Sequence, residues 1–172
     1  MEFVLQNPGL VGVAVAASLA AAVLGGLATE VGPWYENLRF PSWRPPNWLF
    51  GPVWTTIYVL VVSAGVIAYK HAPDDSARAW LIGLFALNCV LNVLWSPLFF
   101  KLRRPDWALL EIVPFWLSIA ALLYHISRIS TLAGWLFSPY LIWVTFAGYL
   151  NWRMVELNKP FETNWPFRRT GK

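Results

Sequence analysis

The sequence is poor in the residues that most enzyme and metal sites use. Its 172 residues include one cysteine, Cys89, and two histidines, His71 and His125, and 13% of them are charged. A lone cysteine excludes a disulfide framework and a thiolate metal cluster. Each histidine lies at the end of an apolar run with no partner at ligand spacing. The sequence therefore predicts no metal site and no cofactor, and it contains no conventional catalytic motif.

Apolar residues dominate instead, at 58% of the chain with a mean hydropathy of +0.50. Crossing about 30 Å of hydrocarbon takes about 20 apolar residues in a helix. Such runs occur at about residues 10–28, 48–69, 79–100, 107–126 and 132–152. They are about twice the length of a barrel strand, and in lipid only helices and closed barrels satisfy the backbone. We therefore expect an all-α integral membrane protein, a bundle of five transmembrane helices forming one domain over residues 1–172, with a basic tail at 153–172.

The lysines and arginines are distributed unequally between the two ends of such a bundle. Five spans place Lys70, Arg78 and Arg128 on one side and the other ten basic residues, including the tail, on the opposite side. Because Lys and Arg collect in cytoplasmic loops, we expect a cytoplasmic C-terminus and a non-cytoplasmic N-terminus in a multi-pass protein, such as one of the bacterial cytoplasmic membrane. The pI near 9.5 then reflects topology and the lipid bilayer as partner, and no nucleic acid is expected.

Polar residues inside the runs are few, and three of them share a helix face. Asn88, Asn92 and Ser96 recur every four residues, beside Trp95. Such a stripe faces protein or a cavity rather than lipid, so helix-to-helix hydrogen bonding and ligand lining both remain open. The acid Glu111 lies near the start of the fourth run, and we expect it at the membrane interface.

Twelve tryptophans require two explanations. Those at the run ends fit an interfacial aromatic belt: Trp80, Trp107, Trp135, Trp152 and Trp165. Those inside the runs are candidates for packing around a cavity, with core filling as the alternative: Trp54, Trp95, Trp116 and Trp143. A further cluster, FPSWRPPNWLFGPVW at residues 40–54, combines rigid aromatic surface with prolines.

Three segments resemble the translocator protein family (TspO, also called the peripheral benzodiazepine receptor family, TspO/MBR). They are PSWRPPNWLFGPVWTTIYVL at 41–60, LNVLWSPLFF at 91–100, and PYLIW with YLNWR between 139 and 153. The resemblance implies a five-helix bundle, often a homodimer, with a pocket between the helices and the Pro/Trp-rich first loop acting as a lid.

The resemblance also implies ligands: porphyrins such as protoporphyrin IX, benzodiazepine-type drugs and, in many members, sterols such as cholesterol. Carried over by motif position, the ligand-binding residues would be Tyr35, Trp43, Trp54, Asn92, Trp95 and Trp143. From charge alone, Arg39 and Arg44 are candidates for pairing with porphyrin propionates. Val144, Tyr149 and Arg153 fit the family's loose sterol consensus, although Tyr149 and Arg153 could equally be interface anchors.

Three functions of different class follow. The first is a membrane receptor or carrier that binds tetrapyrroles and other flat apolar ligands. The second is an enzyme for light- and oxygen-dependent degradation of protoporphyrin, with Trp54 and Trp143 as the catalytic side chains. The third is a membrane scaffold whose pocket holds structural lipid.

Overall fold

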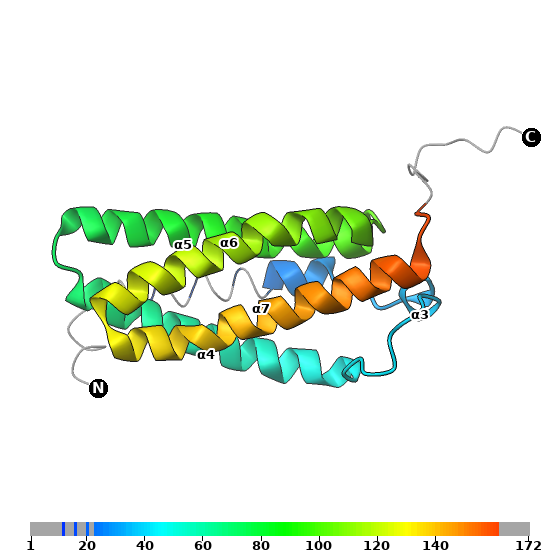
Figure 1. Cartoon of the computed structure of the whole chain (residues 1–172), viewed down its shortest axis with the longest axis horizontal. Helices are drawn as coiled ribbons and strands as arrows, with labels where there is room; N and C mark the ends of the chain where they lie inside the picture. Colours follow the sequence, from blue (N-terminus) through cyan, green and yellow to red (C-terminus); the bar gives the residue numbers. More distant parts are fainter. Residues whose placement is uncertain (1–11, 13–15, 17–19, 21–22, 162–172) are drawn as a thin grey trace, which may run out of the picture.

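The computed structural model describes residues 12, 16, 20 and 23–161, and in this part of the chain every regular element is helical. A short helix, α3 (Pro33–Glu36), precedes the long ones. Those are α4 (Asn47–His71), α5 (Asp75–Ser96), continued by a π-helical turn η1 (Pro97–Lys101), α6 (Pro105–Ile129) and α7 (Thr131–Asn158) (Figure 1). They confirm four of the predicted spans. The first, 10–28, lies largely outside the described residues, of which 23–28 are helical.

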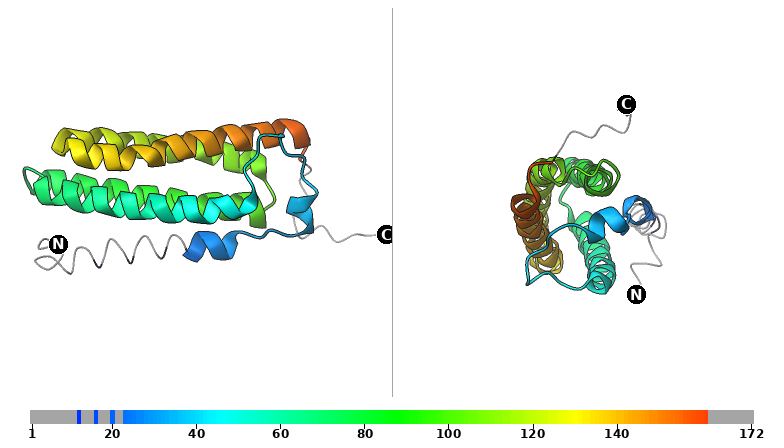
Figure 2. Two further views of the ribbon diagram at one scale, coloured as in Figure 1. Left: turned by 90° about the horizontal axis from the view of Figure 1, so that it is seen from below. Right: turned by 90° about the vertical axis from the view of Figure 1, so that its right-hand side faces the viewer.

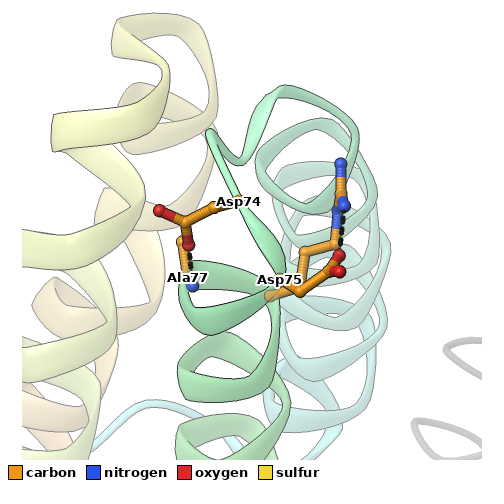
Figure 3. A network of polar contacts seen from close by, with 4 residues as sticks. Asp74, Asp75 and Ala77 are labelled. Carbon is orange, nitrogen blue, oxygen red and sulfur yellow. Dashed lines mark hydrogen bonds and ion pairs between the residues drawn. The ribbon is translucent and has the colours of Figure 1, made fainter.

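Polar side chains cap the starts of α5 and α7, which begin before the corresponding apolar runs. The carboxylate of Asp74 accepts a 2.7 Å hydrogen bond from the backbone N–H of Ala77 at the start of α5. Asp75 pairs with Arg78 at 2.7 Å in the same turn (Figure 3). Ser130 accepts a bond from the N–H of Ala133 at the start of α7. Side-chain acceptors of this kind satisfy N–H groups that have no partner in the first turn.

The long helices pack in the order α5, α6, α7, α4 around the bundle. α6 packs on both α5 and α7, and α4 packs mainly on α7, whereas the backbones of the consecutive helices α4 and α5 approach each other at few points. Figure 2 shows this arrangement from the end where α3 lies. At the opposite end the core is tight, because the fully buried Ala64 and Ala68 of α4 let their helix approach Leu122, Ile126 and Phe137.

The outer surface of the bundle is apolar. Leu110 and Ile142 are 71% and 69% exposed, and further leucines, isoleucines and valines project outward from each long helix. All four of these helices are long and apolar enough to cross a membrane. An apolar surface of this extent is unfavourable in water and suits contact with lipid, so the protein is a multi-pass membrane protein.

One end of the bundle, here called the loop end, gathers three segments that are far apart in sequence. They are the first loop (residues 29–46), the α5–α6 connection and the end of α7 (Figure 1). The side-chain amide of Asn158 binds the backbone of Arg39 twice, accepting from its N–H and donating to its carbonyl, each at 2.8 Å. The first loop is thereby fastened to the last turn of α7.

A candidate ligand-binding cavity under the first loop

A cavity of about 550 Å³ lies between the four long helices at the loop end. Each long helix contributes an aromatic side chain to its wall: Trp54, Trp95, Phe115 and Trp143. Gly25 and Gly26, which precede the first loop, and Tyr35 of α3, which lies within that loop, also line the cavity. The volume falls within the roughly 300–1,000 Å³ of small-molecule sites.

Five of the six ligand-binding residues expected from the resemblance line this cavity: Tyr35, Trp54, Asn92, Trp95 and Trp143. The sixth, Trp43, is not among the lining residues. Its ring stacks on that of Tyr149 with 5.2 Å between centroids and 14° between planes. Trp43 therefore fastens the first loop to α7 by stacking, while the other five line the cavity. That these residues bind a ligand stays a prediction.

A chain of hydrogen bonds crosses the bundle beside the cavity. Tyr58 of α4 donates to Asn92 of α5 at 3.1 Å, and Asn92 donates to the hydroxyl of Tyr140 on α7 at 3.0 Å. Tyr140 donates to Asn88 of α5 at 3.0 Å, and Asn88 donates to Ser118 of α6 at 2.8 Å. Each group donates to the next, so the chain links all four helices. The polar stripe therefore makes helix-to-helix hydrogen bonds. Asn92 and Tyr58 also line the cavity, and a ligand-lining role for the stripe stays a prediction.

Tyr58 and Tyr140 were not predicted as site residues. Both tyrosines lie inside apolar runs, and a buried hydroxyl group there needs a partner. This requirement could have indicated both tyrosines from the sequence, because the side-chain amides of Asn88 and Asn92 on α5 are suitable partners. Which tyrosine meets which amide depends on helix pairing, which periodicity does not give.

The indole N–H groups divide the interior tryptophans into two kinds. Trp116 donates to the hydroxyl of Thr145 on α7 at 2.7 Å and does not line the cavity. In contrast, the buried N–H groups of Trp95 and Trp143 make no hydrogen bond with any residue that the structure describes. Both residues line the cavity, but their N–H groups are enclosed rather than facing it.

Glu111 is 8% exposed and lies inside the bundle, on the buried face of α6. The helical face explains this, since Ala108, Phe115 and Ser118 are buried on the same side at three- and four-residue spacing. The depth of Glu111 relative to the membrane interface stays a prediction.

The two arginines proposed to pair with propionates lie in the first loop but do not line the cavity. The guanidinium carbon of Arg44 is 3.7 Å from the ring centroid of Phe40 and 5.7 Å from that of Tyr35. Burial raises the pKa of the Tyr35 phenol, and the positive charge of Arg44 partly offsets this effect. Arg44 thus contacts Tyr35, which lines the cavity, but does not line the cavity itself. Propionate pairing by Arg39 and Arg44 stays a prediction.

The three residues of the sterol consensus do not share one face of α7. Val144 is buried and lines the cavity. Tyr149 is exposed and stacks on Trp43, and Arg153 pairs with Glu156. Because Val144 faces the interior while Tyr149 faces outward, one sterol on the outer surface of α7 would not contact all three residues.

Comparison with known proteins identifies the family. The model of the TspO/MBR family matches residues 14–157. The chain belongs to the TspO/MBR family. It is 37% identical over 139 residues to "Protein CrtK" of Rhodobacter capsulatus, covering 81% of this chain and 87% of the relative. It is 37% identical over 142 residues to the "Tryptophan-rich sensory protein" of Cereibacter sphaeroides, covering 83% and 87%.

Members from animals are also similar. The chain is 36% identical over 127 residues to the "Translocator protein" of Bos taurus, covering 73% of this chain and 75% of that protein. The matched region of the TspO/MBR family model contains every aromatic residue named above in the cavity wall.

Proposed function

We propose that this TspO/MBR protein is a membrane receptor or carrier that binds tetrapyrroles such as protoporphyrin IX, and other flat apolar ligands, in the cavity under the first loop. The observation that carries the proposal is the aromatic wall, to which each of the four long helices contributes. Flat macrocycles bury apolar area against such rings, at about 25 cal/mol per Å² before the cost of ordering is subtracted.

The first loop supports the proposal as a lid. Its two attachments to α7, through Asn158 and through Trp43, are close to the last turns of that helix. Opening would break the two hydrogen bonds of Asn158, the ring contacts of Trp43 with Phe146 and Tyr149 and the ion pair between Glu30 and Lys101. All of these are non-covalent, so the cavity can be closed without a covalent tie. Arg39 and Arg44 are placed on the same loop, where they would meet propionates that extend beyond the apolar wall.

A second candidate function is light- and oxygen-dependent degradation of protoporphyrin. Trp54 and Trp143 both line the cavity, so a bound pigment would contact the two indoles proposed as redox-active. The third candidate, a scaffold with structural lipid in the cavity, predicts that the porphyrin neither binds saturably nor changes.

The test is a titration of the purified protein with protoporphyrin IX in the dark, followed by tryptophan quenching, and then illumination of the complex. Saturable quenching without protein-dependent loss of porphyrin absorption supports a receptor or carrier. Conversion that disappears in Trp54→Phe or Trp143→Phe supports the enzyme. Absence of saturable quenching would refute the tetrapyrrole proposal and leave the scaffold.

The assembly and location are proposals of the same kind. We expect a homodimer with the N-terminus outside and the C-terminus in the cytoplasm, in a bacterial cytoplasmic membrane. The structure supports the orientation through charge, since Arg39, Arg44 and Lys101 lie at the loop end and Lys70 and Arg128 at the other. Cysteine labelling from either side of sealed vesicles measures the orientation directly.

A further inference from the structure

The outer surface of the bundle carries a second hollow, here called the α4–α7 groove. It has a volume of about 530 Å³ and lies between those two helices. Each helix contributes a stripe of residues at three- and four-residue spacing: Pro52, Val53, Thr56, Ile57 and Leu60 on α4, and Pro139, Ile142, Trp143 and Phe146 on α7. Because Pro52, Thr56 and Ile142 are exposed, the groove opens on the apolar outer surface that suits contact with lipid.

The lining of this groove is apolar. The hydroxyl of Thr56, its one polar side chain apart from the indole of Trp143, donates to the carbonyl of Pro52 at 2.9 Å. The N–H of that indole is enclosed. A molecule lying in the groove therefore meets apolar surface, which favours a ligand dissolved in the hydrocarbon of the bilayer.

Trp143 separates the groove from the cavity. It is the one residue that the two sets of lining residues share among those that the structure describes. Its neighbours divide between the two spaces, since Ile142 lines the groove and Val144 lines the cavity. On α4 the division also falls between consecutive residues, with Gly51 at the cavity and Pro52 at the groove. The indole of Trp143 is thus a common wall of both spaces.

Ring packing holds this indole in place. Phe50 of α4 meets it edge to face with 5.7 Å between centroids, and Phe146 of α7 lies at 5.4 Å. Such pairs contribute about 0.5–1.5 kcal/mol each beyond the area that they bury. The N–H of Trp143 makes no hydrogen bond with any residue that the structure describes. Moving the indole aside therefore costs ring contacts but no hydrogen bond within this part of the chain.

We propose that the α4–α7 groove binds flat apolar ligands from the bilayer and admits them to the cavity, with Trp143 as the movable partition. The inference rests on the proposed function of the cavity as a ligand site. The first loop is fastened to α7 through Asn158 and Trp43 at the loop end. A ligand that enters between α4 and α7 reaches the cavity while that loop stays attached.

Filling the groove tests the entrance. Thr56→Phe places a ring in the groove at a residue that does not line the cavity. The full-length protein in phosphatidylcholine nanodiscs is mixed with protoporphyrin IX in the dark, and tryptophan quenching gives the association rate. Excess empty phosphatidylcholine vesicles then give the dissociation rate. We expect Thr56→Phe to slow both rates by about tenfold or more. The dissociation constant should stay within about twofold, because an obstructed entrance raises the barrier and leaves the bound state unchanged.

Two matched controls separate filling from other effects of the substitution. Thr56→Val removes the same hydroxyl without adding a ring. Val59→Phe adds a ring to α4 at a residue that is 62% exposed and lines neither space. Both controls should keep the wild-type rates. If Thr56→Phe does not fold, Ile142→Trp fills the same groove from α7 and should slow both rates instead.

Asn158→Ala tests the competing route under the first loop, because it removes both hydrogen bonds between Asn158 and the backbone of Arg39. Its rates should match the wild type. Faster rates in Asn158→Ala, together with unchanged rates in Thr56→Phe, would place the entrance at the first loop and overturn the proposal.

Unchanged rates in every folded groove variant would assign the groove to another occupant and would likewise overturn the entrance. That occupant would be a second copy of the chain if the variant alters the oligomer on size exclusion, and a lipid acyl chain if it does not. Absence of saturable binding by the wild type would instead refute the proposed function. The two failures are therefore distinguishable within one experiment.

Discussion

Tyr140 donates a 3.0 Å hydrogen bond to Oδ1 of Asn88, which joins α7 to α5, two helices whose backbones make little direct contact. The same hydroxyl accepts a hydrogen bond from Asn92 one turn further along α5. A single phenol thus fixes the distance across the bundle next to the cavity. The chain of hydrogen bonds through Tyr140, here called the frame, fixes the spacing of the helices around the cavity.

Tyr140→Phe should therefore destabilise the bundle. It leaves an amide oxygen of Asn88 and an N–H of Asn92 without their partner, and unsatisfied buried groups cost about 1–3 kcal/mol each. Thermal unfolding in detergent measures the loss. Tyr124→Phe is the control, because Tyr124 is 64% exposed on α6 and should unfold as the wild type does. Equal unfolding temperatures for the two variants would contradict the frame.

The corner between α6 and α7 leaves no room for a side chain at Gly134. A Cβ there would lie 2.4 Å from Oγ and 3.1 Å from Cα of Ser127, and the second contact is with backbone that does not move easily. Gly134→Ala should destabilise the protein by about 1–3 kcal/mol, seen as a lower unfolding temperature.

Gly83→Ala on α5 is the matched change, since its Cβ would meet nothing within 4 Å. It should leave stability unchanged or raise it by up to about 1 kcal/mol, because alanine favours helix. A similar loss in both variants would show that helix packing at Gly134 is not the cause.

Asn158→Ala should loosen the first loop. The substitution removes both hydrogen bonds to the backbone of Arg39, so the amide of Arg39 should exchange its hydrogen faster, by about tenfold for each 1.4 kcal/mol lost. Hydrogen–deuterium exchange measures this directly. In the control Asn37→Ala only a bond within its own turn is lost, to the carbonyl of Pro33, and exchange at Arg39 should not change.

Trp143→Phe should weaken protoporphyrin IX binding by about tenfold, if the proposed function holds. The variant removes part of the ring area that lines the cavity, together with a buried N–H group that has no partner in the described chain. Trp116→Phe alters an indole that bonds Thr145 away from the cavity, so its affinity should stay close to the wild type. Tryptophan quenching in the dark compares the three proteins, and equal affinities would place the ligand elsewhere.

The sequence alone determined the broad architecture. Length and hydropathy are local properties, so the runs at 48–69, 79–100, 107–126 and 132–152 predicted the four long helices, and the family motifs predicted the residues that gather at the cavity. The separation of basic residues between the two ends followed from counting spans, since each crossing reverses the side.

Only the tertiary structure decided which helices pair and what each side chain meets. Three features depend on residues that are far apart in sequence. They are the pairing of α4 with α7 rather than α5, the bond between Tyr140 and Asn88 and the burial of Glu111. Periodicity states which residues share a face of one helix, but it does not state which neighbour that face contacts. The packing of the whole bundle decides these contacts. It places Trp43 against Tyr149, whereas the other five ligand-binding residues expected from the family resemblance line the cavity.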